Sequence, residues 1–122
     1  MIGYATIGSN DFERSKTFYD TVLAPLGGKR TMTMDRMQFY GGGAGGGMFA
    51  VCKPYDGEAA TGGNGAMLAL SAPTKEVVDQ VHAAALVAGA ACEGPPGQRM
   101  DNFYGAYFRD PAGNKICAFK MG

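Results

Sequence analysis

Short runs of alternating hydrophobic and polar residues come in groups along this chain, and each group contains one longer run with helical spacing. Over residues 2–8 the alternation predicts a strand with Tyr4 and Thr6 on one face and Ala5 and Ile7 on the other. Apolar residues three or four positions apart then predict an amphipathic helix, and three strand-like runs follow it. The three strands are expected over residues 29–35, 37–41 and 48–53.

The ends of the first helix carry recognisable signals. Asn10 is a favoured N-cap residue, and Glu13 lies three positions later, where a capping box places an acidic side chain. Gly27 and Gly28 are expected to end the helix, because glycine readily adopts the left-handed conformation found there.

The second half repeats the order of the first. A strand is expected over residues 66–71, and Thr74 is expected to cap a helix that Gly89 ends. A short strand over 90–93, a loop rich in proline and glycine, and strands over 104–109 and 115–121 follow. The last two strands are joined by the sequence Asp-Pro-Ala-Gly-Asn, whose proline and glycine favour a tight reversal.

The two halves align in register. Tyr4 falls on Met67, and the same offset places Asp11 on Thr74. Near the end of each half, Cys52 is matched with Cys117, with a small change of offset that loop lengths explain. We therefore predict a single domain over residues 1–122, built of units 1–53 and 66–122 with a polar, glycine-rich linker over 54–65.

Composition excludes several classes of protein. The 122 residues contain 11 Lys and Arg against 11 Asp and Glu, so a basic surface that binds nucleic acid is not expected. The longest apolar stretch, residues 83–92, is too short to span a membrane. The start lacks a basic segment followed by an apolar run, so no signal peptide is predicted. Three scattered cysteines do not form a disulfide framework, and we expect a cytoplasmic protein.

Two motifs together resemble a known family. The helix carries Asp11, Ser15, Phe18 and Tyr19 in the pattern D-x-x-x-S-x-x-F-Y, and the last turn reads D-P-x-G-N. With two βαβββ units, the chain resembles the vicinal oxygen chelate superfamily, which holds glyoxalase I, extradiol dioxygenases, fosfomycin-resistance enzymes and bleomycin-resistance proteins. The resemblance implies an α+β fold in which each unit curls into half of an open barrel around a ligand chamber. It also implies a homodimer whose chambers contain sheets of two chains.

In metal-dependent members of this superfamily, a His on the first strand of each unit and a Glu on the last strand hold the metal. The resemblance places these positions at Tyr4 and Met67 and at Cys52 and Cys117. Divalent metals prefer imidazole and carboxylate, so no metal cofactor is expected. The single histidine, His82, belongs to the second helix on the convex side. Two thiols and a thioether suit Cu(I), but such residues more commonly fill apolar interiors.

Strand alternation and the resemblance together predict the lining of the chamber. Its residues are small, apolar, or carry a thiol, a hydroxyl or a phenol, which favours neutral and partly aromatic ligands. Among them we see no fixed cation for an anionic ligand, except Lys53 at the edge. The predicted lining consists of Tyr4, Thr6, Met48, Ala50, Cys52, Met67, Ala69, Cys117 and Phe119.

The residues and the resemblance are compatible with three functions. The first is a metal-free protein of the glyoxalase/bleomycin-resistance type that binds an apolar or aromatic small molecule. The second is a lyase or isomerase of the glyoxalase I type with a metal at a non-standard site; acid–base chemistry by Lys53 or Tyr4 is a weaker variant. A dioxygenase is disfavoured, because iron requires two histidines and the chain has one. The glycine run over 41–47 lacks the P-loop pattern and predicts a hairpin loop.

Overall fold

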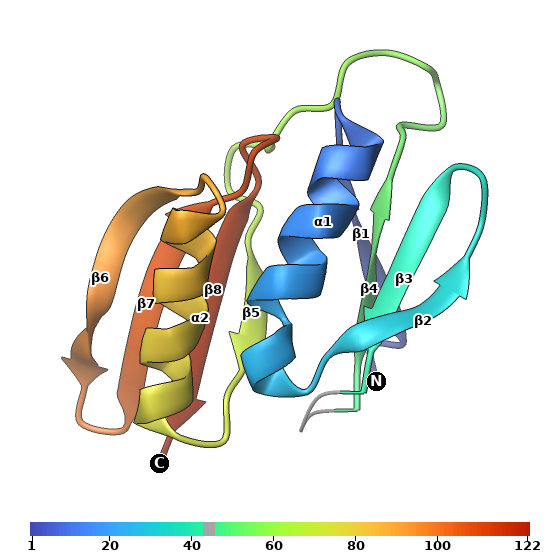
Figure 1. Cartoon of the computed structure of the whole chain (residues 1–122). Helices are drawn as coiled ribbons and strands as arrows, with labels where there is room; N and C mark the ends of the chain where they lie inside the picture. Colours follow the sequence, from blue (N-terminus) through green and yellow to red (C-terminus); the bar gives the residue numbers. More distant parts are fainter. Residues whose placement is uncertain (43–45) are drawn as a thin grey trace.

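Each half of the chain folds in the predicted order of strand, helix and three strands (Figure 1). The computed structural model describes residues 1–42 and 46–122. The first half contains β1 (Tyr4–Gly8), α1 (Phe12–Val22), the 3₁₀ helix η1 (Ala24–Leu26), β2 (Lys29–Thr33), β3 (Met37–Gly41) and β4 (Met48–Cys52). The second half contains β5 (Leu68–Ser71), α2 (Lys75–Val87), β6 (Ala91–Met100), β7 (Phe103–Arg109) and β8 (Lys115–Met121).

The two halves form separate sheets with the same topology. The strand order is β1-β4-β3-β2 in the first and β5-β8-β7-β6 in the second. In each sheet the first and last strands of the unit run parallel, and the other neighbours run antiparallel. The predicted α+β fold of two βαβββ units is confirmed, and the described sheets do not close into a barrel.

The N-terminus of α2 is capped as predicted, whereas that of α1 is capped one residue later than predicted. The Thr74 side chain accepts a hydrogen bond from the Val77 backbone at 3.2 Å. In α1 the cap is Asp11. Asn10 instead exchanges two hydrogen bonds with the backbone of Ala60, at 2.7 and 3.1 Å. The Asn10 prediction is therefore wrong, because its side chain ties the linker to the helix start.

After α1 the chain forms the 3₁₀ helix η1 before it reaches the glycines that were predicted to end the helix. Pro25 lies in the first turn of η1, where a missing N–H costs least. Gly27 then adopts a left-handed conformation with φ of 74° and ends η1. The apolar stripe therefore continues to Leu26, although the α-helix itself ends at Val22.

Strand β6 is longer than the short strand expected over 90–93. It continues to Met100 through Pro95 and Pro96, with shifts of register against β7. Because β6 lies at the edge of its sheet, the missing N–H groups of the prolines interrupt no central ladder. The sequence therefore predicted a loop where the structure has an irregular edge strand.

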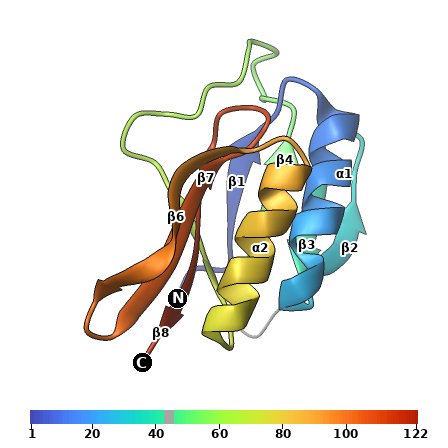
Figure 2. The same ribbon diagram turned by 60° about the vertical axis from the view of Figure 1, so that its left-hand side comes forward.

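One hydrophobic core extends through both units. Helices α1 and α2 pack against each other on one side of the sheets, as Figures 1 and 2 show. Phe18 of α1 contacts Phe108 of β7, with ring centroids 6.3 Å apart. Val22 and Val81 are fully buried in the same cluster. The core is therefore shared between the two units.

A buried polar network also joins the units. The Tyr19 hydroxyl donates to the Asp110 carboxylate at 2.6 Å, and burial together with this carboxylate raises the pKa of Tyr19 well above its usual value. The second Asp110 oxygen accepts from the backbones of Ala112 and Asn114, both at 2.9 Å. The Asn114 amide donates to the Gly8 carbonyl at 2.8 Å. The D-P-x-G-N turn thus holds both α1 and β1.

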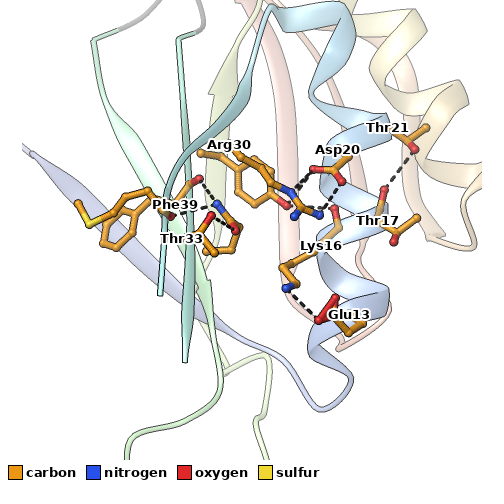
Figure 3. Close-up of polar contacts among 11 residues, drawn as sticks. Glu13, Lys16, Thr17, Asp20, Thr21, Arg30, Thr33 and Phe39 are labelled. Carbon is orange, nitrogen blue, oxygen red and sulfur yellow. Dashed lines mark hydrogen bonds and ion pairs between the residues drawn. The ribbon is translucent and has the colours of Figure 1, made fainter. Parts of the chain in front are cut away.

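Figure 3 shows polar contacts of unit 1 within α1, within the sheet and between the two. Arg30 of β2 forms a two-pronged ion pair with Asp20 of α1, at 2.8 and 2.9 Å. Lys16 pairs with Glu13 at 3.0 Å, and its carbonyl accepts from the Tyr40 hydroxyl at 3.0 Å. The basic side chains Lys16 and Arg30 are therefore paired with α1 carboxylates.

Two further sequence predictions concern the glycine-rich loop and membrane-spanning segments. The glycine run predicted as a loop falls between β3 and β4, but residues 43–45 lie outside the described residues. Over residues 1–42 and 46–122, neither helix has the length and apolar character that crossing a membrane requires.

Candidate functional site

Each sheet has one face covered by helices and one face that helices do not cover, called here the open face. In unit 1 the buried Tyr40, Phe49 and Val51 join the shared core with α1. Because side chains alternate along a strand, their neighbours in sequence point to the open face. Leu68 and Ile116 belong to the same core and define the helix-covered side of unit 2.

The open face of unit 1 contains all five of its predicted lining residues. Tyr4 pairs in register with Met48, Thr6 with Ala50, and Gly8 with Cys52. Phe39 of β3, which was not predicted, lies opposite Ala50 and meets Tyr4 edge to face at 5.2 Å.

The open face of unit 2 contains the other four predicted residues. Cys117 lies opposite Ala69 on one side and Tyr107 on the other, with Phe119 two residues along β8. Met67 precedes β5 by one residue. The prediction of the lining omitted Tyr107 and other residues of β7 and β6. Counting across the β7–β8 hairpin from Cys117 would have found Tyr107, since cross-strand partners share a face.

A single chain leaves much of these faces exposed. Tyr4 is 56% exposed, Met67 50% and Met48 39%. Ala50 and Cys117 are buried, because larger neighbours surround these small central residues. In a single chain the two open faces are therefore partly uncovered.

A cavity of about 450 Å³ lies between the units. It brings together three of the predicted residues, Met48, Met67 and Ala69, beside the core residue Phe49 and the partly buried Leu26. The other six predicted residues do not line it. Most of its wall is apolar, so its contents would be held by burial of apolar surface and not by charge.

The pairing of the strands corrects one detail of the predicted alignment between the two halves of the chain. The Ser9 N–H donates to the Cys52 carbonyl, and the corresponding bond in unit 2 runs from Ala72 to Phe119. Cys52 is thus equivalent to Phe119, and matching it with Cys117 is wrong by two residues. Because Thr6 pairs with Ala50 as Ala69 pairs with Cys117, the unit-1 equivalent of Cys117 is Ala50. A shift of two keeps the same face but moves the position about 6–7 Å along the strand.

The residues at the superfamily's metal positions do not fit a divalent metal. After this correction the four positions hold Tyr4, Ala50, Met67 and Cys117, a set without imidazole or carboxylate. Burial raises the pKa of the Cys117 thiol, which opposes the thiolate form that metals bind. Across the described residues, no three His, Cys, Asp or Glu side chains come close enough to hold a metal ion.

The distribution of cations differs from the sequence prediction. Lys53, the only cation expected near the chamber, lies over the Phe12 ring of α1 with its ammonium 5.4 Å from the ring centroid. On unit 2, Arg99 and Lys115 instead flank the Tyr107 ring, at 5.5 and 5.6 Å. The premise that an anion would find no cation except Lys53 is therefore wrong.

His82 lies on α2 with its ring toward the shared core, as the sequence predicts for the convex side. Its Nε2 atom is 3.3 Å from the Cys92 sulfur, and its ring meets Phe108 edge to face. Burial lowers the pKa of His82, and Asp79 opposes this shift. Since Cys92 pairs with the core residue Phe108 on the helix-covered side, this contact is separate from the open faces.

Comparisons with known proteins agree with this architecture. The family model of the Glyoxalase/Bleomycin resistance protein/Dioxygenase superfamily matches residues 1–118. A crystal structure of a glyoxalase/bleomycin resistance protein from Albidiferax ferrireducens T118 is 41% identical, with a TM-score of 0.91 over 100% of this chain and 99% of its own. No curated protein matches the chain.

More distant structures share the fold alone. A glyoxalase/bleomycin resistance protein/dioxygenase family enzyme from Burkholderia phytofirmans PsJN is 21% identical, with a TM-score of 0.78 and 98% of each chain covered. A lactoylglutathione lyase from Agrobacterium tumefaciens is 19% identical, with a TM-score of 0.73, and the match covers 98% of this chain and 92% of that one. The chain therefore belongs to the Glyoxalase/Bleomycin resistance protein/Dioxygenase superfamily.

Proposed function

We propose that the protein binds a small molecule with an aromatic or apolar body, without a metal ion, in a chamber bordered by the two open faces. The observation that supports this most directly is the donor set at the superfamily's metal positions. Tyr4, Ala50, Met67 and Cys117 offer apolar surface, a phenol and a thiol in place of imidazoles and carboxylates. Such surfaces favour ligands that lose little solvation on entering.

The competing function is a lyase of the glyoxalase I type with a metal at a non-standard site. It would require another group of metal-binding side chains, and the described residues contain no such group of three His, Cys, Asp or Glu. We therefore favour binding or sequestration, as in a bleomycin-resistance type of protein. All three cysteines are free, which fits the reducing cytoplasm that we propose as its location.

We further propose that a second copy closes the chamber, with the open face of unit 1 in one chain against that of unit 2 in the other. The support is the apolar surface that the single chain exposes on both faces, at Tyr4, Met48 and Met67. Light scattering at micromolar concentration is expected to give twice the 12.7 kDa of one chain. A mass of one chain over a wide range of concentration would contradict the dimer.

The binding function is tested with a fluorescent aromatic probe, because the chain contains no Trp to interfere. Either 2-naphthoate or 2-naphthamide should bind to protein that elemental analysis shows to be free of metal. Ala69→Phe should weaken binding of both probes at least about tenfold, because the added ring fills space over the exposed Ala69. Ala59→Phe, in the exposed linker, is the matched control and should leave affinity unchanged.

Failure would take two forms. If neither probe binds at millimolar concentration, the protein has no aromatic binding site of this kind. If purified protein contains Ni, Zn, Mn or Fe in equal proportion to chains, the metal-free proposal is wrong and the lyase gains support.

A further inference from the structure

A platform of small residues runs across the centre of the open face of unit 2. Ala69, Cys117 and Gly105 occupy neighbouring strands β5, β8 and β7 on this face. At one end Phe103 and Phe119 stack with ring centroids 5.3 Å apart and an interplanar angle of 7°. The Phe103 ring packs closely against Gly105, where a Cβ would come within 2.8 Å of the ring. The platform is apolar and bounded at this end by aromatic rings. Cys117 and Gly105 are buried within it, so a ligand would meet the exposed Ala69 and the partly exposed rings of Phe103 and Phe119.

Cations bound the opposite end of the platform. Tyr107 lies directly beside Cys117, and its ring is flanked by Arg99 at 5.5 Å and Lys115 at 5.6 Å. Positive charges at these distances interact favourably with the ring face. Burial raises the pKa of Cys117, and Tyr107 together with the same two cations opposes that rise.

The positive charge at this end is only partly neutralised. Glu93 pairs with Arg109 at 2.9 Å and lies 4.0 Å from Lys115. In the described part of the chain, Arg99 has no carboxylate within ion-pair distance; its guanidinium donates to the Pro95 carbonyl instead. Two cations thus share one carboxylate and Arg99 has none among the described residues, which leaves an excess of positive charge next to an apolar platform.

The backbone of β6 leaves room for this arrangement. A Cβ on Gly94 would lie 3.0 Å from the Tyr107 ring and 3.2 Å from the Arg99 guanidinium. A Cβ on Gly97 would lie 2.8 Å from the same guanidinium. The two glycines in this irregular edge strand therefore allow Arg99 to fold back over Tyr107.

We propose that the open face of unit 2 binds an aromatic carboxylate, with the ring over Ala69 beside the stacked phenylalanines and the carboxylate at the end that carries Arg99 and Lys115. A guanidinium and an ammonium match a carboxylate in charge and hydrogen bonding, and the stacked phenylalanines suit a planar ring. The opposing wall would be the open face of unit 1, where Tyr4 and Phe39 add aromatic surface and no competing carboxylate. This inference rests on the proposed function and specifies its ligand class.

The experiment compares two probes of the same shape and different charge. Titrations of the intact protein with 2-naphthoate and 2-naphthamide are followed by naphthalene fluorescence. The carboxylate should bind at least about tenfold more tightly than the amide. Arg99→Gln and Lys115→Gln should each weaken 2-naphthoate about tenfold while changing 2-naphthamide less than twofold.

Lys75→Gln is the matched control, because Lys75 lies 5.5 Å from the ring of Tyr104 on the helix-covered face of the same strand β7. It should leave both affinities unchanged. Phe119→Leu should weaken both probes, and circular dichroism should show every variant to be folded.

The outcomes separate this inference from the proposed function. Equal affinity for the two probes would overturn the carboxylate site. So would 2-naphthoate binding that neither Arg99→Gln nor Lys115→Gln weakens. In both cases weaker binding by Ala69→Phe would still support the binding chamber of the proposed function. An effect of Lys75→Gln equal to that of Lys115→Gln would show a general effect of charge and would also overturn it. Absence of binding by both probes would refute both proposals.

Discussion

Replacing Asp110 with alanine is expected to lower the free energy of unfolding by about 3–5 kcal/mol. The carboxylate is buried and accepts hydrogen bonds from Tyr19, from the Asn114 side chain and from two backbone N–H groups. Removing it leaves several buried donors without partners. Because domains are typically stable by about 5–15 kcal/mol, this loss should be large in urea unfolding at fixed protein concentration.

Two tyrosine–aspartate pairs provide the control for this network. Tyr19 and Asp110 are 2.6 Å apart and buried, while Tyr104 and Asp79 have the same 2.6 Å separation at the surface. Tyr19→Phe should cost about 1–3 kcal/mol and Tyr104→Phe less than about 0.5 kcal/mol. Equal costs for the two substitutions would show that burial of the network adds nothing.

The pH dependence of stability gives a second measure of the same pair. Burial raises the pKa of Tyr19 in the folded state above its value in the unfolded chain. The stabilisation is therefore complete below about pH 10, the ordinary tyrosine value, and is lost as the pH rises further. Stability should fall less steeply above that pH in Tyr19→Phe than in the unchanged protein.

The second large effect concerns metal binding. The variant Tyr4→His, Ala50→Glu, Met67→His and Cys117→Glu should bind Ni²⁺ or Zn²⁺ at least about 100-fold more tightly than the unchanged protein, because it supplies two imidazoles and two carboxylates. Calorimetry measures the affinity, and circular dichroism confirms folding, since Ala50 is buried.

The matched variant moves one carboxylate by two residues, with Cys52→Glu in place of Ala50→Glu. It should bind metal at least about tenfold more weakly, because Cys52 pairs with Gly8 while Ala50 pairs with Thr6. Tighter binding by the Cys52→Glu variant would mean that Cys52, and not Ala50, is the unit-1 equivalent of Cys117. No binding by either folded variant would mean that the open faces do not come together in the assembled protein.

The faces of the strands were predictable because alternation depends only on the order of residues. Tyr4, Thr6, Met48, Ala50 and Cys52 share an open face, as expected from a period of two. Thr74 was also predictable as a cap, since its partner lies three residues away. Asn10 was not, because its side chain bonds to Ala60, 50 residues along the chain.

The position of residues along a strand was less predictable than their face. Cys52 and Cys117 follow similar apolar neighbours, which favoured matching them. Their ladders nevertheless place them two residues apart in register, opposite Gly8 and Ala69. Register depends on which backbone groups meet across strands, and the parallel pairs β1–β4 and β5–β8 have no short turn that would fix it from the sequence.

The sequence by itself thus determined the two βαβββ units, the faces of their central strands and the absence of imidazole from the predicted lining. The tertiary structure alone placed Arg99 and Lys115 beside Tyr107, directed Lys53 toward α1, and joined Tyr19 to Asp110. The physical reason is the separation in sequence between the residues that interact. Alternation and capping arise from residues a few positions apart, whereas these contacts depend on the bend of an edge strand and on the packing of one unit against the other.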